Sequence, residues 1–214
     1  MKFSKRDCRD FVDLWRHFPR LDRKHTQLIG PCDSRYNCIA WAAGVTNIHW
    51  WPYDGEAGVA GYDGTDTFWP AGAPVSEDAD AFVAAFKTIN YKMCENGLPE
   101  NGFTKIALFV RNGRVRHAAR QLDAVLWTSK FGCQSPVAIH RLRDVCGYYG
   151  QTTVFMRRPT NYVTKQIDAR RVAVEVAKPM NVSTIGGLSF AEASRQIKRS
   201  SFEPPKPKRG YCFA

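Results

Sequence analysis

Residues 36–44 read YNCIAWAAG, a run of small and apolar residues that predicts one short buried helix. Pro31 and Asp33 interrupt the chain just before this run, and its last residue is a glycine. Cys38 falls in the first turn of the predicted helix, where unpaired backbone N–H groups and the positive end of the helix dipole favour an anion. A cysteine in this position has a lowered pKa and a more available thiolate. Cys38 is therefore a candidate nucleophile, and an inert buried thiol is the alternative interpretation.

A histidine that could pair with this cysteine lies in a predicted β-hairpin. Two strand-like runs, 105–111 and 114–122, are separated by an Asn-Gly pair at 112–113, the strongest short sign of a type I′ turn. This turn sets the register and predicts Leu108 opposite His117. The face that carries His117 is apolar, so we expect the imidazole to point inward, toward the side on which the cysteine helix packs. A core histidine bonded to backbone is the alternative.

The third strand of this sheet is predicted over 125–131, after a short connection. A two-residue connection would turn Thr128 toward the histidine, and a slip of one residue would turn Ser129 inward instead. Gln121 adds a polar amide on the histidine face. A nucleophile, a base and a polar group that orients the base are the parts that covalent acyl chemistry requires. The opposite face of the hairpin is basic and is predicted to face solvent; it comprises Lys105, Arg111, Arg114, Arg116 and Arg120.

The order of cysteine helix, hairpin and further strand resembles the papain-like NlpC/P60 and CHAP hydrolases. Residues 105–118, KIALFVRNGRVRHA, are similar to the hairpin that those families carry after their cysteine helix. The resemblance covers about the central half of the chain and rests on short motifs. It implies a papain-like α+β fold and suggests peptidoglycan stem peptides as one class of substrate.

One position departs from the NlpC/P60 pattern. The catalytic histidine of that pattern usually opens the first hairpin strand, where this chain has Lys105, and His117 falls where such proteins often carry a second histidine. Either the roles have moved, or the chain is a relative that lost or changed its chemistry. A closer resemblance, over residues 18–159, is to a mainly bacterial family of domains of unknown function. The motifs that carry it include YNCIAWAAG, HAARQ and WTSKFG.

The remaining elements complete an α+β prediction, with helices first and then an antiparallel sheet with one inserted helix. Helices are expected near 11–18, 79–92 and 135–146, and a further strand over 148–157. Residues 45–74 are predicted to form a long ordered loop. Its tryptophans, together with one from the third strand and the amide noted above, are candidate walls of a substrate pocket or a cover over the core: Trp50, Trp51, Trp69, Trp127 and Gln121.

The chain length of 214 residues allows one domain with an extension. Hydrophobic residues make up 44% and charged residues 24%, as in ordinary globular proteins. No apolar run is long enough to span a membrane, and no apolar segment follows the basic residues at the N-terminus. Seven cysteines, an odd number, favour reduced thiols. We expect a cytoplasmic protein, or one delivered by a route that needs no signal peptide.

The net charge of +11 is concentrated near the C-terminus. Residues 157–214 hold 12 Lys/Arg and 4 Asp/Glu, a balance of +8, which leaves +3 for the other 156 residues. We therefore predict a domain over 1–159 and a basic extension over 160–214, with a short helix near 189–198 and a disordered Pro/Lys-rich end. The extension is either a solvated tail or a docking segment for a polyanion or protein partner.

These observations favour a cysteine-dependent amide hydrolase or acyl-transfer enzyme, in which Cys38 attacks as thiolate and His117 protonates the leaving amine. Backbone N–H groups at the helix start would receive the oxyanion. Peptide, protein or peptidoglycan amides are the expected substrates. No metal-ligand spacing or phosphate loop is present, so no cofactor is expected. The alternative is a non-catalytic papain-like binding module whose basic extension docks on a partner.

Overall fold

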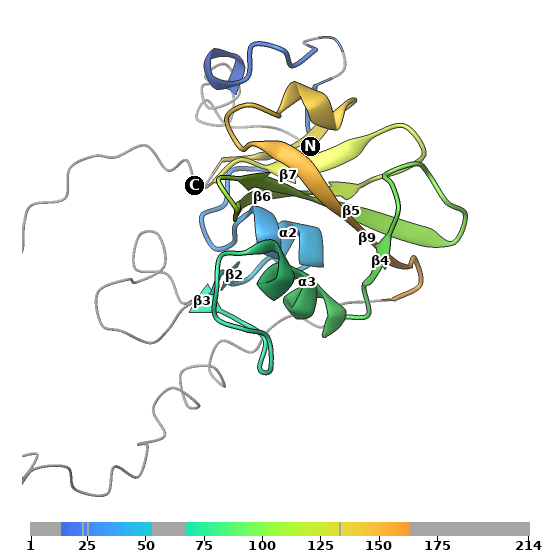
Figure 1. The fold of residues 1–214 in the computed structure, drawn as a ribbon. Coiled ribbons are helices and arrows are strands. Elements are labelled where there is room, and N and C mark those ends of the chain that lie inside the picture. Colours follow the sequence, from blue (N-terminus) through green and yellow to red (C-terminus); the bar gives the residue numbers. More distant parts are fainter. Residues whose placement is uncertain (1–13, 23, 25, 53–66, 133, 163–214) are drawn as a thin grey trace, which may run out of the picture. The chain divides into compact units, whose positions relative to one another are not determined.

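The fold is known from a computed structural model that describes residues 14–22, 24, 26–52, 67–132 and 134–162. It is an α+β structure built on a seven-stranded antiparallel sheet (Figure 1). The strand order is β1-β8-β7-β6-β5-β9-β4. The strands are β1 (Gln27–Leu28), β4 (Lys92–Cys94), β5 (Phe103–Arg111), β6 (Arg114–Gln121), β7 (Trp127–Lys130), β8 (Pro136–Ile139) and β9 (Gln151–Pro159). The predicted class is thereby confirmed.

Both faces of this sheet are covered. Helices α2 (Cys38–Ala43) and α3 (Ala79–Lys87) lie on one side, with the small parallel pair β2 (His49–Trp50) and β3 (Thr67–Phe68) beside them (Figure 1). On the other side, the helical residues 14–17 and the short 3-10 helix η2 (Leu142–Asp144) cover a buried cluster. Strand β7 therefore has no solvent-facing side, and every side chain along it is buried.

Helix α2 forms where the sequence predicted it, and side chains hold both of its ends. At the N-terminus, Asn37 accepts a hydrogen bond from the Ala40 N–H and donates one to the carbonyl of Trp50 over 2.8 Å. At the C-terminus, Gly44 takes a left-handed conformation with φ 85°. This helix has only six residues, so its stability comes from these caps and from burial rather than from its length.

The C-terminal carbonyls of α2 receive two further donors from distant parts of the chain. The Arg158 guanidinium donates to the Ala43 carbonyl over 3.2 Å, and the Tyr91 hydroxyl donates to the Ala42 carbonyl over 3.3 Å. A cation at this end also complements the helix dipole. The guanidinium lies 4.5 Å from the centre of the Tyr91 ring, so the two donors support each other.

The hairpin register differs from the prediction at its centre. Arg111 lies opposite Arg114 as a two-residue turn requires, but His117 lies opposite Phe109 rather than Leu108. A β-bulge next to Val110 inserts one extra residue into β6 and shifts the pairing. The Asn-Gly pair at 112–113 predicts the turn but does not predict a bulge further along the strands.

Two predicted helices are also corrected. Residues 135–146 form strand β8 and helix η2 instead of one helix, because residues 136–139 are a short apolar run that is buried between two neighbouring strands. Helix α3 ends at Lys87, and residues 92–94 form the edge strand β4. Asn90, with a φ of 70°, marks the break between them. The strand predicted over 148–157 is confirmed as β9.

The basic extension, apart from residues 160–162, lies outside the described residues, as do the short helix predicted near 189–198 and positions 53–66 of the predicted loop. In the described part of the chain, no helix is long and apolar enough to cross a membrane.

We predict that Asn37→Ala lowers the free energy of unfolding by about 2–3 kcal/mol, because it removes a helix cap and leaves the buried Trp50 carbonyl without its donor. Asp78→Ala is the matched control, since Asp78 caps α3 through Ala81 but is exposed, and should cost about 1 kcal/mol. Urea unfolding of both variants measures the difference. Equal losses would show that the bond to Trp50 contributes nothing.

Candidate functional site

Cys38 is the first residue of α2 and is buried, with 1% of its surface exposed. Burial raises the pKa of its thiol to about 11. The backbone of Ala118 and the positive charge of Lys130 act in the opposite direction but do not outweigh burial. The thiol therefore stays protonated near neutral pH, contrary to the lowered pKa expected for a cysteine at a helix start.

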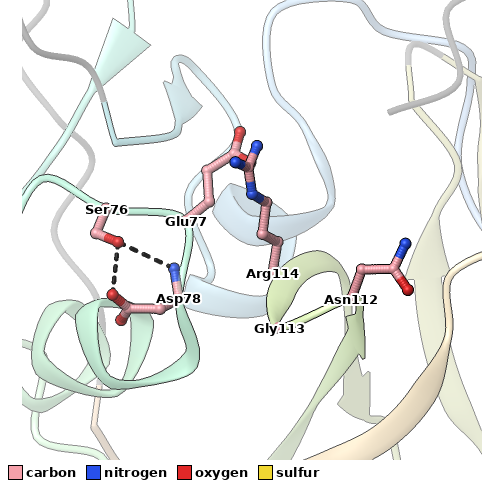
Figure 2. A pocket seen from close by; sticks show the side chains of 6 residues that line it. All are labelled: Ser76, Glu77, Asp78, Asn112, Gly113 and Arg114. Carbon is pink, nitrogen blue, oxygen red and sulfur yellow. Dashed lines mark hydrogen bonds and ion pairs between the residues drawn. The ribbon is translucent and has the colours of Figure 1, made fainter.

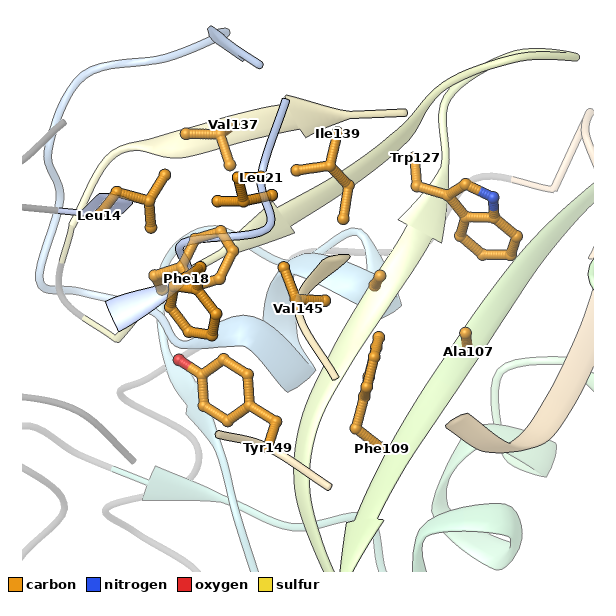
Figure 3. Close-up of a cluster of buried hydrophobic side chains, with 12 residues drawn as sticks. Leu14, Phe18, Leu21, Ala107, Phe109, Trp127, Val137, Ile139, Val145 and Tyr149 are labelled. Atoms are coloured by element: carbon orange, nitrogen blue, oxygen red, sulfur yellow. The ribbon is translucent and has the colours of Figure 1, made fainter. Parts of the chain in front are cut away.

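His117 is fully buried and packs against rings of the hydrophobic cluster that lies on the opposite side of the sheet from α2; Figure 3 shows that cluster. The His117 ring lies parallel to that of Tyr149 at 3.9 Å between centroids, and it also contacts Phe131 and Phe109. Its Nε2 is hydrogen-bonded to the Ser129 hydroxyl, and its Nδ1 has no hydrogen-bond partner among the described residues. Burial lowers the pKa of the imidazole to about 3, so the ring is neutral at physiological pH.

Side-chain alternation shows that His117 and Cys38 do not meet. The Arg120 guanidinium lies 4.7 Å from the Trp41 ring of α2, and Trp41 Nε1 donates to the Thr128 hydroxyl over 2.9 Å. These contacts identify the face of β6 and β7 on which α2 packs. His117 is three residues before Arg120 on the same strand, so its imidazole points to the other face. The expected pairing of thiol and imidazole is not formed.

Strand register also separates the two candidate orienting residues. Ser129 lies opposite Ala119 and bonds His117, whereas Thr128 lies opposite Arg120 and bonds Trp41. The one-residue slip considered for this strand is therefore the arrangement found. Ser129 therefore orients His117, but His117 is stacked inside the core and does not face Cys38.

The five residues expected to line a substrate pocket are divided between the two faces. Trp50, Trp51 and Trp69 pack beside α3 in an aromatic layer, where Trp51 and Trp69 contact Phe82 edge to face. Trp50 instead contacts the Phe68 and Phe86 rings. This arrangement matches the alternative role, a cover over the core.

The other two predicted wall residues lie on the His117 face, remote in the fold from that aromatic layer. Trp127 contacts the Phe155 ring, and the Gln121 amide donates to the Gly97 carbonyl over 3.4 Å. Within the described part of the chain, these five side chains are therefore not gathered at one place.

A set of side chains that sequence reasoning missed forms a continuous stack on the α2 face. In order it comprises Arg120, Trp41, Tyr36 and Lys130, and we call it the cation–aromatic stack. The Tyr36 and Trp41 rings lie nearly parallel, 5.9 Å apart. A cation lies 4.7 Å from the centroid of each ring: Arg120 over Trp41, and Lys130 over Tyr36.

The basic face of the hairpin faces solvent only in part: Arg111 and Arg114 are exposed, as the sequence indicated, whereas two other members are covered. Arg120 is half-buried against α2, and Lys105 is buried on the His117 side, where its Nζ donates to the Asn96 carbonyl and pairs with Glu100. The sheet is covered on both faces, which a single alternating pattern in one hairpin cannot reveal. The sequence feature that could have indicated a second covered face is the pair of polar residues at alternate positions of β7, Thr128 and Lys130.

A surface cavity of about 460 Å³ lies between the hairpin turn and the start of α3 (Figure 2). Arg114 pairs with Glu77 at 3.4 Å across it, and Ser76 bonds the Asp78 carboxylate. The cavity contains none of the predicted site residues and no nucleophile–base pair. Across the described part of the chain, no cluster of three or more histidine, cysteine or acidic residues is arranged to hold a metal ion.

We predict that His117 makes stability depend on pH. Its pKa is 6.5 when unfolded and about 3 when folded, so between these values only the unfolded chain binds the proton. Stability should fall as pH decreases through this window, by about 1.4 kcal/mol per pH unit from this group. His117→Phe, which keeps a ring against Tyr149, should remove that component in urea unfolding at several pH values.

A slope that is the same in His117→Phe as in the parent protein would contradict the assignment.

Comparison with known protein families gives one match. The family model described as a domain of unknown function, DUF7689, matches residues 27–157, which is more than half of the chain. The comparisons with curated proteins and with solved structures found no match. The matched region begins at β1 and ends within β9, so it contains α2, α3 and the whole cation–aromatic stack but not the helical residues 14–17. The chain therefore belongs to the DUF7689 family.

Proposed function

We propose that this domain is a non-catalytic binding module, a relative of the papain-like hydrolases in which the cysteine helix has a structural role. The observation that carries this proposal is the placement of Cys38 and His117 on opposite faces of the sheet. Covalent acyl chemistry needs a nucleophile and a base within hydrogen-bond reach. The two groups are separated by the sheet itself, and a change of rotamer does not bring them together.

The protonation states of the two groups support the same proposal. With a pKa of about 11, the Cys38 thiol is almost entirely neutral at pH 7, and its thiolate is about a hundredfold rarer than at the ordinary value of 9.0. With a pKa of about 3, His117 cannot hold a proton for a leaving group. A thiolate–imidazolium pair would need the pKa of Cys38 to be lowered and the pKa of His117 to be raised, the opposite of both shifts found.

Lys105 is consistent with a relative that lost its chemistry. It occupies the position at which the NlpC/P60 pattern places its catalytic histidine, and its buried ammonium pairs with Glu100. It lies four residues before Phe109, the partner of His117, and so faces the His117 side of the sheet rather than α2. Neither histidine position of the NlpC/P60 pattern supplies a base to Cys38.

Positive charge supports a binding role toward anionic partners. The chain has a net charge of +11, and the cation–aromatic stack places two cations and two aromatic rings on one face. We propose that the basic residues of 157–214 act as an electrostatic anchor that brings an acidic partner or polyanion to the domain. A reduced, cytoplasmic setting, or delivery without a signal peptide, is proposed with it.

One observation favours the second candidate, a cysteine-dependent amide hydrolase or acyl-transfer enzyme. The charge of Lys130 and the backbone of Ala118 both act to lower the pKa of Cys38. If the cover over the thiol opened and the desolvation were relieved, these groups would favour a thiolate. In that case Lys130, not His117, would stabilise the nucleophile, and peptide or peptidoglycan amides would be the substrates.

Thiol reactivity distinguishes the two candidates. We predict that iodoacetamide at pH 7.5 alkylates Cys38 at least about tenfold more slowly than the half-buried Cys94 and Cys146, because the Cys38 thiol is fully buried and burial raises its pKa to about 11. Peptide mapping by mass spectrometry over a time course measures each rate. In urea the three rates should converge, which serves as the control.

Preferential alkylation of Cys38 would overturn the binding proposal and support the enzyme. Its dependence on Lys130 would then be checked with Lys130→Met, in comparison with His117→Phe.

A further inference from the structure

Two exposed arginines of this domain, Arg20 and Arg111, have no carboxylate partner. In the part of the chain that the structure describes, each guanidinium forms one hydrogen bond, to a backbone carbonyl, and no ion pair. A guanidinium carries five N–H donors, so both keep donors for an anion. Other arginines are paired with a carboxylate, namely Arg35, Arg114, Arg116, Arg141 and Arg157.

The two guanidiniums lie beside the same turn of the chain. Arg20 Nη2 donates to the Cys146 carbonyl and Arg111 Nη1 donates to the Tyr148 carbonyl, each over 2.6 Å. Two residues of chain span at most about 7 Å, so segments far apart in the sequence bring their positive charges to one place. Arg143, on η2 just before this turn, is also exposed and forms no ion pair among the described residues.

Tyr148 presents an aromatic ring among these cations. It is 36% exposed, and among the large hydrophobic side chains that are exposed in the described part of the chain it is the only aromatic one. The Arg111 guanidinium lies 5.7 Å from the centre of its ring, and the His17 ring lies 6.2 Å from it. The Phe18 and Tyr149 rings meet it at steep angles and anchor it to the core.

Carboxylates are scarce on this surface. Residues 134–162 contain one acidic residue, Asp144, which is buried and paired with Arg141. Residues 14–22 also contain one, Asp22, whose carboxylate accepts a hydrogen bond from the Lys24 N–H. The surface therefore has a positive local potential, which attracts an anionic partner and raises its rate of association.

We propose that Arg20, Arg111, Arg143 and Tyr148, which we call the Tyr148 surface, bind single-stranded nucleic acid. The guanidiniums bind phosphate oxygens, and the tyrosine ring stacks on a base. An exposed ring can receive only a base that is not already paired and stacked in a duplex, so the single strand is the form that fits. The inference rests on the proposed function, because it names the polyanion that the binding module recognises.

The surface predicts separate effects for the ring and for the charges. Tyr148→Leu should weaken the binding of a deoxythymidine oligonucleotide about tenfold, because one base loses its stacking partner. It should leave the binding of heparin, a polyanion without bases, unchanged. Arg20→Gln combined with Arg111→Gln should reduce the slope of log affinity against log salt by about 1.4, since each phosphate contact on a single strand contributes about 0.7.

The test measures the fluorescence anisotropy of labelled deoxythymidine and uridine oligonucleotides with the full chain, over a series of sodium chloride concentrations. Lys87→Gln combined with Lys92→Gln is the matched control, because it removes two charges from exposed residues outside the Tyr148 surface and should leave the slope unchanged. Arg20 and Arg111 also bond carbonyls, so thermal melting accompanies each variant. Arg143→Gln removes no such bond and should reduce the slope by about 0.7.

Equal oligonucleotide affinity in Tyr148→Leu and in the parent protein would overturn the proposal, as would a loss of heparin binding as large as the loss of oligonucleotide binding. A slope that Arg143→Gln leaves unchanged would do the same. Displacement of the oligonucleotide by polyglutamate at equal charge would assign an acidic protein as the partner instead. Comparison of the two oligonucleotides shows whether the strand is DNA or RNA. Failure of the proposed function is seen separately, as fast alkylation of Cys38.

Discussion

The alternation of side chains along β6 and β7, the neighbouring strands at the centre of the sheet, is the constraint on which the rest of this structure depends. It sends Arg120 and Thr128 to helix α2 and His117 and Ser129 to the opposite core. Each polar or titratable side chain in the buried part of these strands therefore lies either against α2 or in the core on the opposite face of the sheet. A single residue of register decides between them, and the bulge next to Val110 shows that the fold adjusts the register locally.

Helix α2 is positioned by contacts at its two ends more than by its own six residues. Asn37 ties its start to the Trp50 carbonyl, and Arg158 and Tyr91 bond the carbonyls at its end. These ties hold Trp41 against Thr128 and so build the cation–aromatic stack. The same burial that makes the helix stable raises the pKa of its cysteine, so structural stability and thiol reactivity oppose each other here.

The buried and half-buried cations of this domain differ in whether they have a hydrogen-bond acceptor or an ion-pair partner. Lys105 is paired with Glu100, and Arg158 is bonded to the carbonyls of Ala43 and Ile89, so both contribute to the fold. Arg120 lies over the ring of Trp41 and has no such acceptor among the described residues. Partnered cations of this kind stabilise the fold.

The local elements could be predicted from sequence because they depend on near neighbours: the cysteine helix from its small residues and glycine end, the hairpin from Asn112-Gly113, and the α+β class from their order. Residues 136–139 were misassigned, because a short apolar run fits a helix or a buried strand equally well. Only the tertiary structure decided which face of the hairpin meets α2. One amphipathic pattern predicts one buried face, whereas this sheet buries two, and that difference separates His117 from Cys38.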